Sequence, residues 1–212
     1  FVSNWFPGFE TGEGQGTPVR LPHTVQELSL HYADHNAYQT VCGYRRKLEL
    51  GPELAGKHLF LQFDGAAHVA VVYLNGRELT THRCGYTAFR VEITDHVRYG
   101  EENIIAVKLD TTENPAVPPF GFVIDYLTYG GLYREAWLDV REQSFISDIY
   151  IATDTTHSAR VQLTLENGAG CQTEIRLLDA DGNCVRTQVG EPVTQLQLPN
   201  ARVWSAADPY RY

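Results

Sequence analysis

The run from residue 118 to 138, PPFGFVIDYLTYGGLYREAWL, holds the side chains best suited to bind a polar ligand. Asp125 lies between Ile124 and Tyr126 in an otherwise apolar stretch. A carboxylate in apolar surroundings is costly unless hydrogen bonds satisfy it. Asp125 is therefore either a structural acid, which caps a turn or pairs with Arg134, or a group that holds a polar ligand.

The overall charge limits the class of partner. The formal net charge is −9, which disfavours nucleic acid and anionic membranes because phosphate groups are bound by basic surfaces. No apolar run reaches the ~18 residues that a membrane span needs. A neutral ligand remains compatible with this composition.

The four cysteines, Cys42, Cys84, Cys171 and Cys184, lack the Cys-x-x-Cys spacing of zinc or redox motifs. Cys171 and Cys184 flank the turn 179–183, and a hairpin closed by that turn would place Cys184 opposite a residue near Leu178. Cys171 would then lie beyond disulfide reach. We interpret all four as free thiols, which favours a reducing, cytoplasmic location.

Alternation of apolar and polar residues, typical of strands, recurs along the chain, whereas helical periodicity is almost absent. The run 58–63 has one extra apolar residue, as a well-buried strand does. Asn75-Gly76, a strong hairpin signal, follows the apolar run 69–74. The predicted strands are 44–50, 58–63, 69–74, 89–93, 104–109, 136–140, 149–152, 159–165, 173–178, 185–189 and 196–198.

Polar residues between 142 and 147 interrupt this pattern and predict two domains, 1–142 and 143–212. The first, of about 140 residues, has the size of a jelly-roll sandwich. The second, of about 70 residues, is shorter than the ~100 typical of an immunoglobulin-like sandwich, so we expect it to lack its last strand or strands. The chain has no Met, which predicts that it is part of a longer reading frame.

Several short motifs occur in a specific order: Leu21-Pro22-His23, Gly43-Tyr44-Arg45, Asp64-Gly65 before Asn75-Gly76, Gly85-Tyr86, Asp125 with Gly130-Gly131-Leu132-Tyr133-Arg134, and Trp204-Ser205 with Asp208-Pro209. Each motif alone is weak. Their order and spacing together resemble the N-terminal part of glycoside hydrolase family 2, the family of β-galactosidases and β-glucuronidases.

The resemblance implies an all-β chain, with a jelly-roll, sugar-binding-like sandwich followed by an incomplete immunoglobulin-like sandwich. It also implies an exo-β-glycosidase, in its β-galactosidase version, that hydrolyses terminal β-D-galactosides with retention. In this family two catalytic glutamates lie on a following (β/α)₈ TIM barrel, and the chain shows no βα alternation. We find no pair of carboxylates to nominate, so we predict that this segment alone is inactive.

The resemblance also implies the partners. These are a β-galactoside or related carbohydrate, the chain's own downstream barrel, and further subunits of a homo-oligomer. No cofactor is assigned to this segment, although Mg or Na beside the sugar is implied for the full-length protein, with ligands mostly from the barrel. None of the eight histidines has the spacing of a metal site.

By the resemblance, Asp125 matches the family acid that reaches into the sugar pocket and accepts hydrogen bonds from sugar hydroxyls. Asn36 matches a family Asn that also contacts the sugar, and the alternative for Asn36 is a solvated loop of turn-forming residues. Phe120 and Tyr126 could form a pocket wall by stacking on the sugar, whereas core packing against Trp137 is their alternative role.

Two alternative functions follow from the same residues. A jelly roll can bind carbohydrate by itself, so the chain could be an autonomous carbohydrate-binding module. An acid at the position of Asp125 also occurs in β-glucuronidases, so the same segment could belong to a glucuronidase.

Overall fold

The structure is a computed structural model that describes residues 1–27, 31, 34–118, 120, 130–153 and 157–212. Its contacts divide the chain into two compact units, Phe1–Val140 and Arg141–Tyr212. The boundary expected from sequence, between residues 142 and 143, lies two residues further along. Each unit is described by itself.

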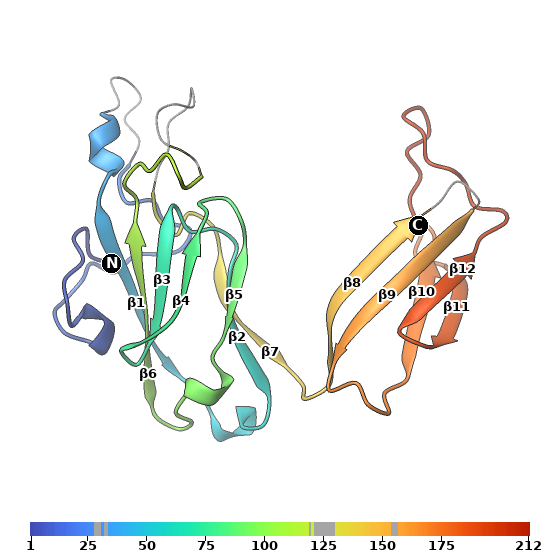
Figure 1. The fold of residues 1–212 in the computed structure, drawn as a ribbon, viewed down its shortest axis with the longest axis horizontal. Coiled ribbons are helices and arrows are strands. Elements are labelled where there is room, and N and C mark those ends of the chain that lie inside the picture. Colours follow the sequence, from blue (N-terminus) through green and yellow to red (C-terminus); the bar gives the residue numbers. More distant parts are fainter. Residues whose placement is uncertain (28–30, 32–33, 119, 121–129, 154–156) are drawn as a thin grey trace. The chain divides into compact units, whose positions relative to one another are not determined.

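Unit 1 (Phe1–Val140) is a sandwich of two sheets (Figure 1). The first has the order β1-β6-β3-β4 and the second the order β5-β2-β7, the last strand ending at Arg141. The pairs β1–β6, β3–β6, β3–β4 and β2–β5 are antiparallel. The bounds are β1 Val41–Glu49, β2 His58–Phe63, β3 Val69–Leu74, β4 Arg77–Arg83, β5 Phe89–Glu92, β6 Glu102–Asp110 and β7 Ala136–Arg141.

The core of unit 1 lies between these sheets, because alternate residues of facing strands point inward. In β3 the inward residues Ala70, Val72 and Leu74 are fully buried, which matches the predicted alternation. In β2 the extra apolar residue Phe60 is buried as well. The guanidinium of Arg90 covers the Phe60 ring at 5.1 Å, so that the outer face of this strand is also protected.

The predicted Asn75-Gly76 hairpin joins β3 to β4. Both turn residues have positive φ, 52° for Asn75 and 83° for Gly76, as this type of tight hairpin requires. The Asn75 amide also donates to the Asn103 side chain at 3.0 Å. The turn is therefore held against the start of β6.

The described helices of unit 1 are single 3₁₀ turns: η1 Phe9–Thr11, η2 His35–Tyr38, η3 Pro52–Leu54 and η4 Thr94–His96. η2 lies at one end of the sandwich, and η3 and η4 lie at the other (Figure 1). We call the end that carries η2 the loop end; it comprises residues 34–40, 64–68, 84–88, 111–118 and 130–133. No helix in the described ranges is long and apolar enough to cross a membrane.

Unit 2 (Arg141–Tyr212) also contains two sheets, with the orders β12-β9-β8 and β10-β11. In the second sheet Leu178 pairs with Cys184, as predicted from the turn between them. All four cysteines of the chain are free thiols. The bounds are β8 Phe145–Thr153, β9 Ser158–Glu166, β10 Thr173–Leu178, β11 Cys184–Gly190 and β12 Val193–Gln197.

The core of unit 2 is small. Its buried apolar residues are Ala159, Val161, Leu163 and Leu196. Ile149 pairs with Leu163 and Ile151 with Val161, so these isoleucines share the inner face of the sheet. They are nevertheless 53% and 60% exposed. The inner face of β8 is thus left largely uncovered by the described residues.

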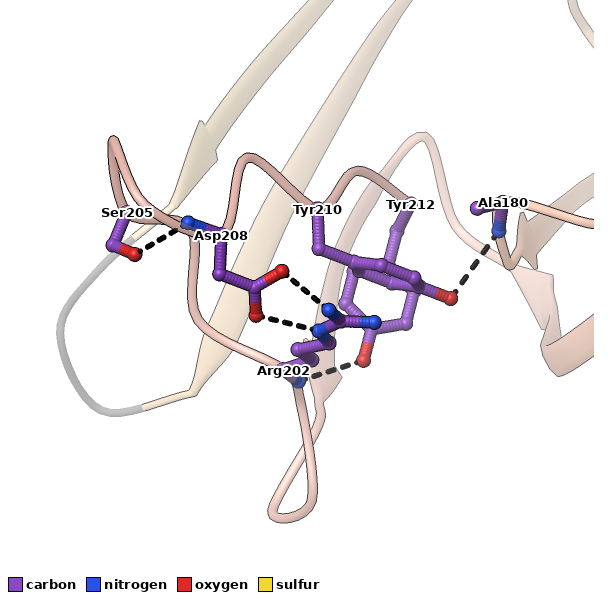
Figure 2. A network of polar contacts seen from close by, with 6 residues as sticks. All are labelled: Ala180, Arg202, Ser205, Asp208, Tyr210 and Tyr212. Carbon is purple, nitrogen blue, oxygen red and sulfur yellow. Dashed lines mark hydrogen bonds and ion pairs between the residues drawn. The ribbon is translucent and has the colours of Figure 1, made fainter.

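The last residues of unit 2 are folded back by a polar network (Figure 2). The guanidinium of Arg202 binds both carboxylate oxygens of Asp208 and covers the Tyr210 ring at 4.6 Å. The Tyr212 hydroxyl accepts a hydrogen bond from the backbone N–H of Arg202 at 2.7 Å, and the Tyr210 hydroxyl accepts one from the backbone N–H of Ala180 at 3.3 Å. These contacts tie the end of the chain to the β10–β11 turn.

Candidate functional site

The structure describes two of the four residues that were proposed from sequence to bind a ligand. Asp125 and Tyr126 lie outside the described residues. Phe120 is 43% exposed, so core packing, its alternative role, is not observed. Asn36 is also exposed and lies in η2 at the loop end.

The turn that holds Asn36 is stabilised by its own side chains. The Asp34 carboxylate accepts the Asn36 backbone N–H at 2.9 Å and the Asn36 side-chain amide at 3.1 Å. Such Asp-capped turns form because a short carboxylate can satisfy the first free N–H groups of a helical turn. The amide of Asn36 is therefore oriented by Asp34.

Thr111 joins this turn to the stretch that precedes Phe120. Its hydroxyl donates to the Tyr38 carbonyl at 2.5 Å and accepts the Thr40 N–H at 3.0 Å. Its backbone N–H donates to the Thr40 carbonyl at 2.9 Å. Thr111 is only 1% exposed, so these bonds are shielded from water. Residues 71 positions apart are thereby placed side by side, and η2 is fixed to the stretch 111–118.

The stretch 111–118 is itself ordered by local turns. Asp110 accepts two hydrogen bonds from Thr112, and Asn114 accepts the Ala116 N–H at 2.9 Å. Further along, the Pro118 carbonyl accepts the Gly85 N–H at 3.0 Å. This stretch, which precedes Asp125 in the sequence, is therefore held at both ends.

Residues 130–132, which follow Asp125 in the sequence, are bound by two other segments. His23 N–H donates to the Leu132 carbonyl at 2.8 Å and Val25 N–H to the Gly130 carbonyl at 2.9 Å. On the other side, Ala67 and Gly131 exchange two backbone hydrogen bonds of 3.0 and 3.1 Å. The backbone after Asp125 thus has neighbours on both edges.

Gly130 and Gly131 are needed at these two positions for different reasons. Gly131 has a positive φ of 133°, which a residue with a side chain rarely adopts. Gly130 is required by close approach instead, because a Cβ at this position would lie 2.2 Å from Cγ2 of Thr111. The glycine pair thus lets the backbone on either side of Asp125 pack together.

Cys84 contributes a titratable group to the loop end. Partial burial raises the pKa of its thiol, but hydrogen bonds from the Thr87 side chain and from the Tyr86 and Thr87 backbone outweigh burial. The pKa of the Cys84 thiol is therefore below its usual value of 9.0. Thr87 also contacts Nε2 of His82 at 2.9 Å, and burial lowers the pKa of this imidazole.

Thr111 and His68 were not among the residues predicted from sequence, although both are buried at the loop end. One signal for His68 was present, since it is a polar residue between Ala66-Ala67 and the apolar run 69–74. The partners of both residues are distant in sequence. Within the described ranges, no three His, Cys, Asp or Glu side chains cluster closely enough to hold a metal ion.

Most of unit 1, including the loop end, matches a domain of a known family. Residues 9–140 match the family model described as "Glycosyl hydrolases family 2, sugar binding domain". The chain belongs to glycosyl hydrolase family 2. The family resemblance expected from the sequence motifs is confirmed, as is the all-β sandwich fold.

Relatives in family 2 match nearly the whole chain. A β-galactosidase of Thermoanaerobacter pseudethanolicus is 30% identical over 96% of this chain and 29% of its own length. A β-glucuronidase of Bacteroides fragilis is 31% identical over 99% of this chain and 34% of its own length. The crystal structure of a putative β-galactosidase from Bacteroides fragilis superposes with a TM-score of 0.77 and 31% identity, over 93% of this chain and 33% of that chain.

This chain therefore spans about a third of the length of the family 2 relatives reported above.

Proposed function

We propose that this chain is the N-terminal, sugar-contacting segment of an exo-β-glycosidase, and of a β-galactosidase in particular. The observation that carries the proposal is the match of residues 9–140 to the family 2 sugar binding domain. The β-galactosidase relative, aligned over 96% of the chain, supports the choice of sugar. Hydrolysis would proceed with retention, using two glutamates on a downstream barrel.

In this proposal Asp125 accepts hydrogen bonds from the hydroxyl groups of the terminal sugar. Hydrogen bonds to a carboxylate are stronger than those between neutral groups, so one acid can fix the orientation of a pyranose. A sugar held in a reactive orientation needs less ordering in the transition state. The hydrogen bonds of 111–118 and 130–132 support such a role, because they restrain the backbone on both sides of Asp125.

Phe120, Tyr126 and Asn36 have secondary roles in the proposal. The exposed ring of Phe120 offers an apolar face to the C–H face of a sugar, and Tyr126 adds a second aromatic ring. Asn36, oriented by Asp34, offers an amide to a sugar hydroxyl at the same end of unit 1. The downstream barrel would complete the pocket and supply the reacting groups.

The decisive experiment replaces Asp125 by Asn in the protein with its downstream region. Loss of a charged hydrogen-bond acceptor predicts a fall in kcat/KM of roughly ten- to hundredfold for a chromogenic β-galactoside. Asp95→Asn is the matched control, because Asp95 is an exposed acid in η4 at the opposite end of the sandwich. Equal kinetics of the two variants would contradict the proposed role of Asp125.

The isolated 212-residue chain should not hydrolyse the same galactoside. Turnover clearly above the blank would contradict the placement of the catalytic glutamates on a downstream barrel. Isothermal titration with galactose and lactose then tests the alternative, an autonomous carbohydrate-binding module. The match of residues 9–140 to a sugar binding domain is the observation that favours this alternative. Millimolar or tighter binding supports that module, and no binding supports a half-site.

A β-glucuronidase is the second candidate activity. The observation in its favour is the β-glucuronidase of Bacteroides fragilis, which is 31% identical over 99% of the chain. Parallel assays of the full-length protein with galactoside and glucuronide substrates distinguish the two. A higher kcat/KM for the glucuronide would replace the galactosidase proposal.

A further inference from the structure

The dipeptide Ala67-His68 connects the two stretches that flank Asp125 in the sequence. Ala67 exchanges two backbone hydrogen bonds with Gly131, as described above. His68 N–H donates to the Asp110 carbonyl at 3.0 Å, and His68 Nδ1 contacts the Thr112 carbonyl at 3.4 Å. One residue thus binds the stretch after Asp125, and the next residue binds the stretch before it.

The side chain of His68 is buried at 2% exposure. A carbonyl oxygen can only accept a hydrogen bond, so Nδ1 carries the hydrogen that points to Thr112. Burial lowers the pKa of this imidazole below 6.5, which keeps it neutral at pH 7. Its Nε2 atom is buried and has no hydrogen-bond partner among the described residues.

This arrangement is not the most stable one for a buried position. A buried polar atom without a partner destabilises the folded state, and an apolar side chain of similar size would avoid that loss. The contact to the Thr112 carbonyl is long, so it offsets only part of the cost. A stability requirement alone therefore does not explain a histidine here.

We propose that His68 is a positioning residue for carbohydrate binding, which acts through Thr112 on the stretch 111–118. This inference rests on the proposed function of the loop end. The donation from Nδ1 to Thr112 sets the spacing between 111–118 and the Ala67–Gly131 pair. It thereby sets the position of Phe120, whose N–H is bonded to the Val117 carbonyl at 2.8 Å.

The test compares three substitutions of His68 in the full-length protein with its downstream region. In His68→Asn the side-chain amide replaces the Nδ1–H donor, whereas His68→Gln places its amide nearer to Nε2 and His68→Leu has no donor. If the stretch 111–118 shifts, His68→Leu and His68→Gln should raise KM for the β-galactoside about tenfold, with kcat changed less than about twofold. His68→Asn should keep KM within about threefold of the wild type.

Asn103→Ala is the matched control for lost stability. Asn103 is fully buried and bonds to the Arg98 carbonyl at 2.8 Å and the Arg98 N–H at 2.9 Å. It lies seven residues before Asp110 on β6, about 23 Å along the strand. This variant should lower the unfolding temperature and leave KM unchanged.

The outcomes separate this inference from the proposed function. An unchanged KM in His68→Gln, or a KM in His68→Asn as high as in His68→Gln, overturns the positioning role even if His68→Leu does not fold. A raised KM in Asn103→Ala also overturns it, because general destabilisation would then explain the effect. Asp125→Asn kinetics identical to those of Asp95→Asn would instead contradict the proposed function.

Discussion

The hydroxyl of Tyr133 donates a 2.6 Å hydrogen bond to the carbonyl oxygen of Gly85. Because Gly85 also donates its N–H to Pro118, one glycine joins residues on either side of Asp125 in the sequence. Gly65 makes room for this contact, since a Cβ at that position would lie 2.9 Å from the Tyr133 hydroxyl. The loop end is thus held together by contacts between distant segments.

Tyr133→Phe should weaken the loop end. The substitution removes the donor and leaves the Gly85 carbonyl without this partner, which predicts a loss of about 1 kcal/mol in the free energy of unfolding. Urea denaturation of the chain measures it. Tyr150→Phe is the control, because Tyr150 is 61% exposed on β8. Equal unfolding midpoints for the two variants would contradict the prediction.

The stability of unit 1 should depend on pH through Glu92. Its carboxylate accepts hydrogen bonds from His58 Nδ1 and Thr94 Oγ1, each at 2.8 Å. The bond from His58 is the larger cause, and together the two bonds lower the pKa of Glu92 below 4.5. A carboxyl with a lowered folded-state pKa stabilises the protein above its unfolded-state pKa. That contribution is lost as the pH falls through the folded-state value.

Glu92→Gln should therefore unfold more easily than the wild type at pH 7, and the difference should shrink below about pH 4.5. The effect is modest because the Glu92 side chain is 49% exposed and screened by water. Urea titrations at pH 7, 5 and 3 measure it. A difference that stays constant over this range would mean that the Glu92 charge is not involved.

The four thiols should differ in their reaction with iodoacetamide. Burial raises the pKa of the Cys42 thiol to about 12, and Cys42 has no exposed surface, so it should stay unmodified in the folded chain. The lowered pKa of Cys84 supplies thiolate at a lower pH than an ordinary thiol does. Peptide mapping after alkylation between pH 6 and 8 should show Cys84 modified at a lower pH than free cysteine added to the same solution. The reverse order would contradict this prediction.

Unit 2 should exchange its amide hydrogens faster than unit 1. Ile149 and Ile151 lie on the inner face of β8 yet are largely exposed, and such an apolar edge strand favours pairing with another chain. The 212-residue chain should therefore self-associate at high concentration, and Ile149→Lys should reduce this in sedimentation experiments. Equal rates of amide hydrogen exchange in the two units, measured on a sample that stays monomeric at high concentration, would contradict both predictions.

Much of the fold could be predicted because strands are encoded by neighbouring residues. The alternation of Ala70, Val72 and Leu74 identified β3, and Asn75-Gly76 identified its turn, since a tight hairpin needs residues that tolerate positive φ. The pairing of Leu178 with Cys184 followed from the length of one turn. These features depend on contacts within a few residues.

The arrangement of the loop end could not be predicted, because it depends on contacts between residues that are far apart in the sequence. Thr111 meets residues 71 and 73 positions away, and His68 meets Thr112 across 44 positions. No local pattern encodes these pairs, because they arise only when the two sheets pack and their loops converge. The sequence alone indicated most of the strands, although not β4, together with two hairpin turns and the family of this protein. The tertiary structure decided which polar groups are buried and which segments hold each other, because burial and long-range hydrogen bonds exist only in the packed sandwich.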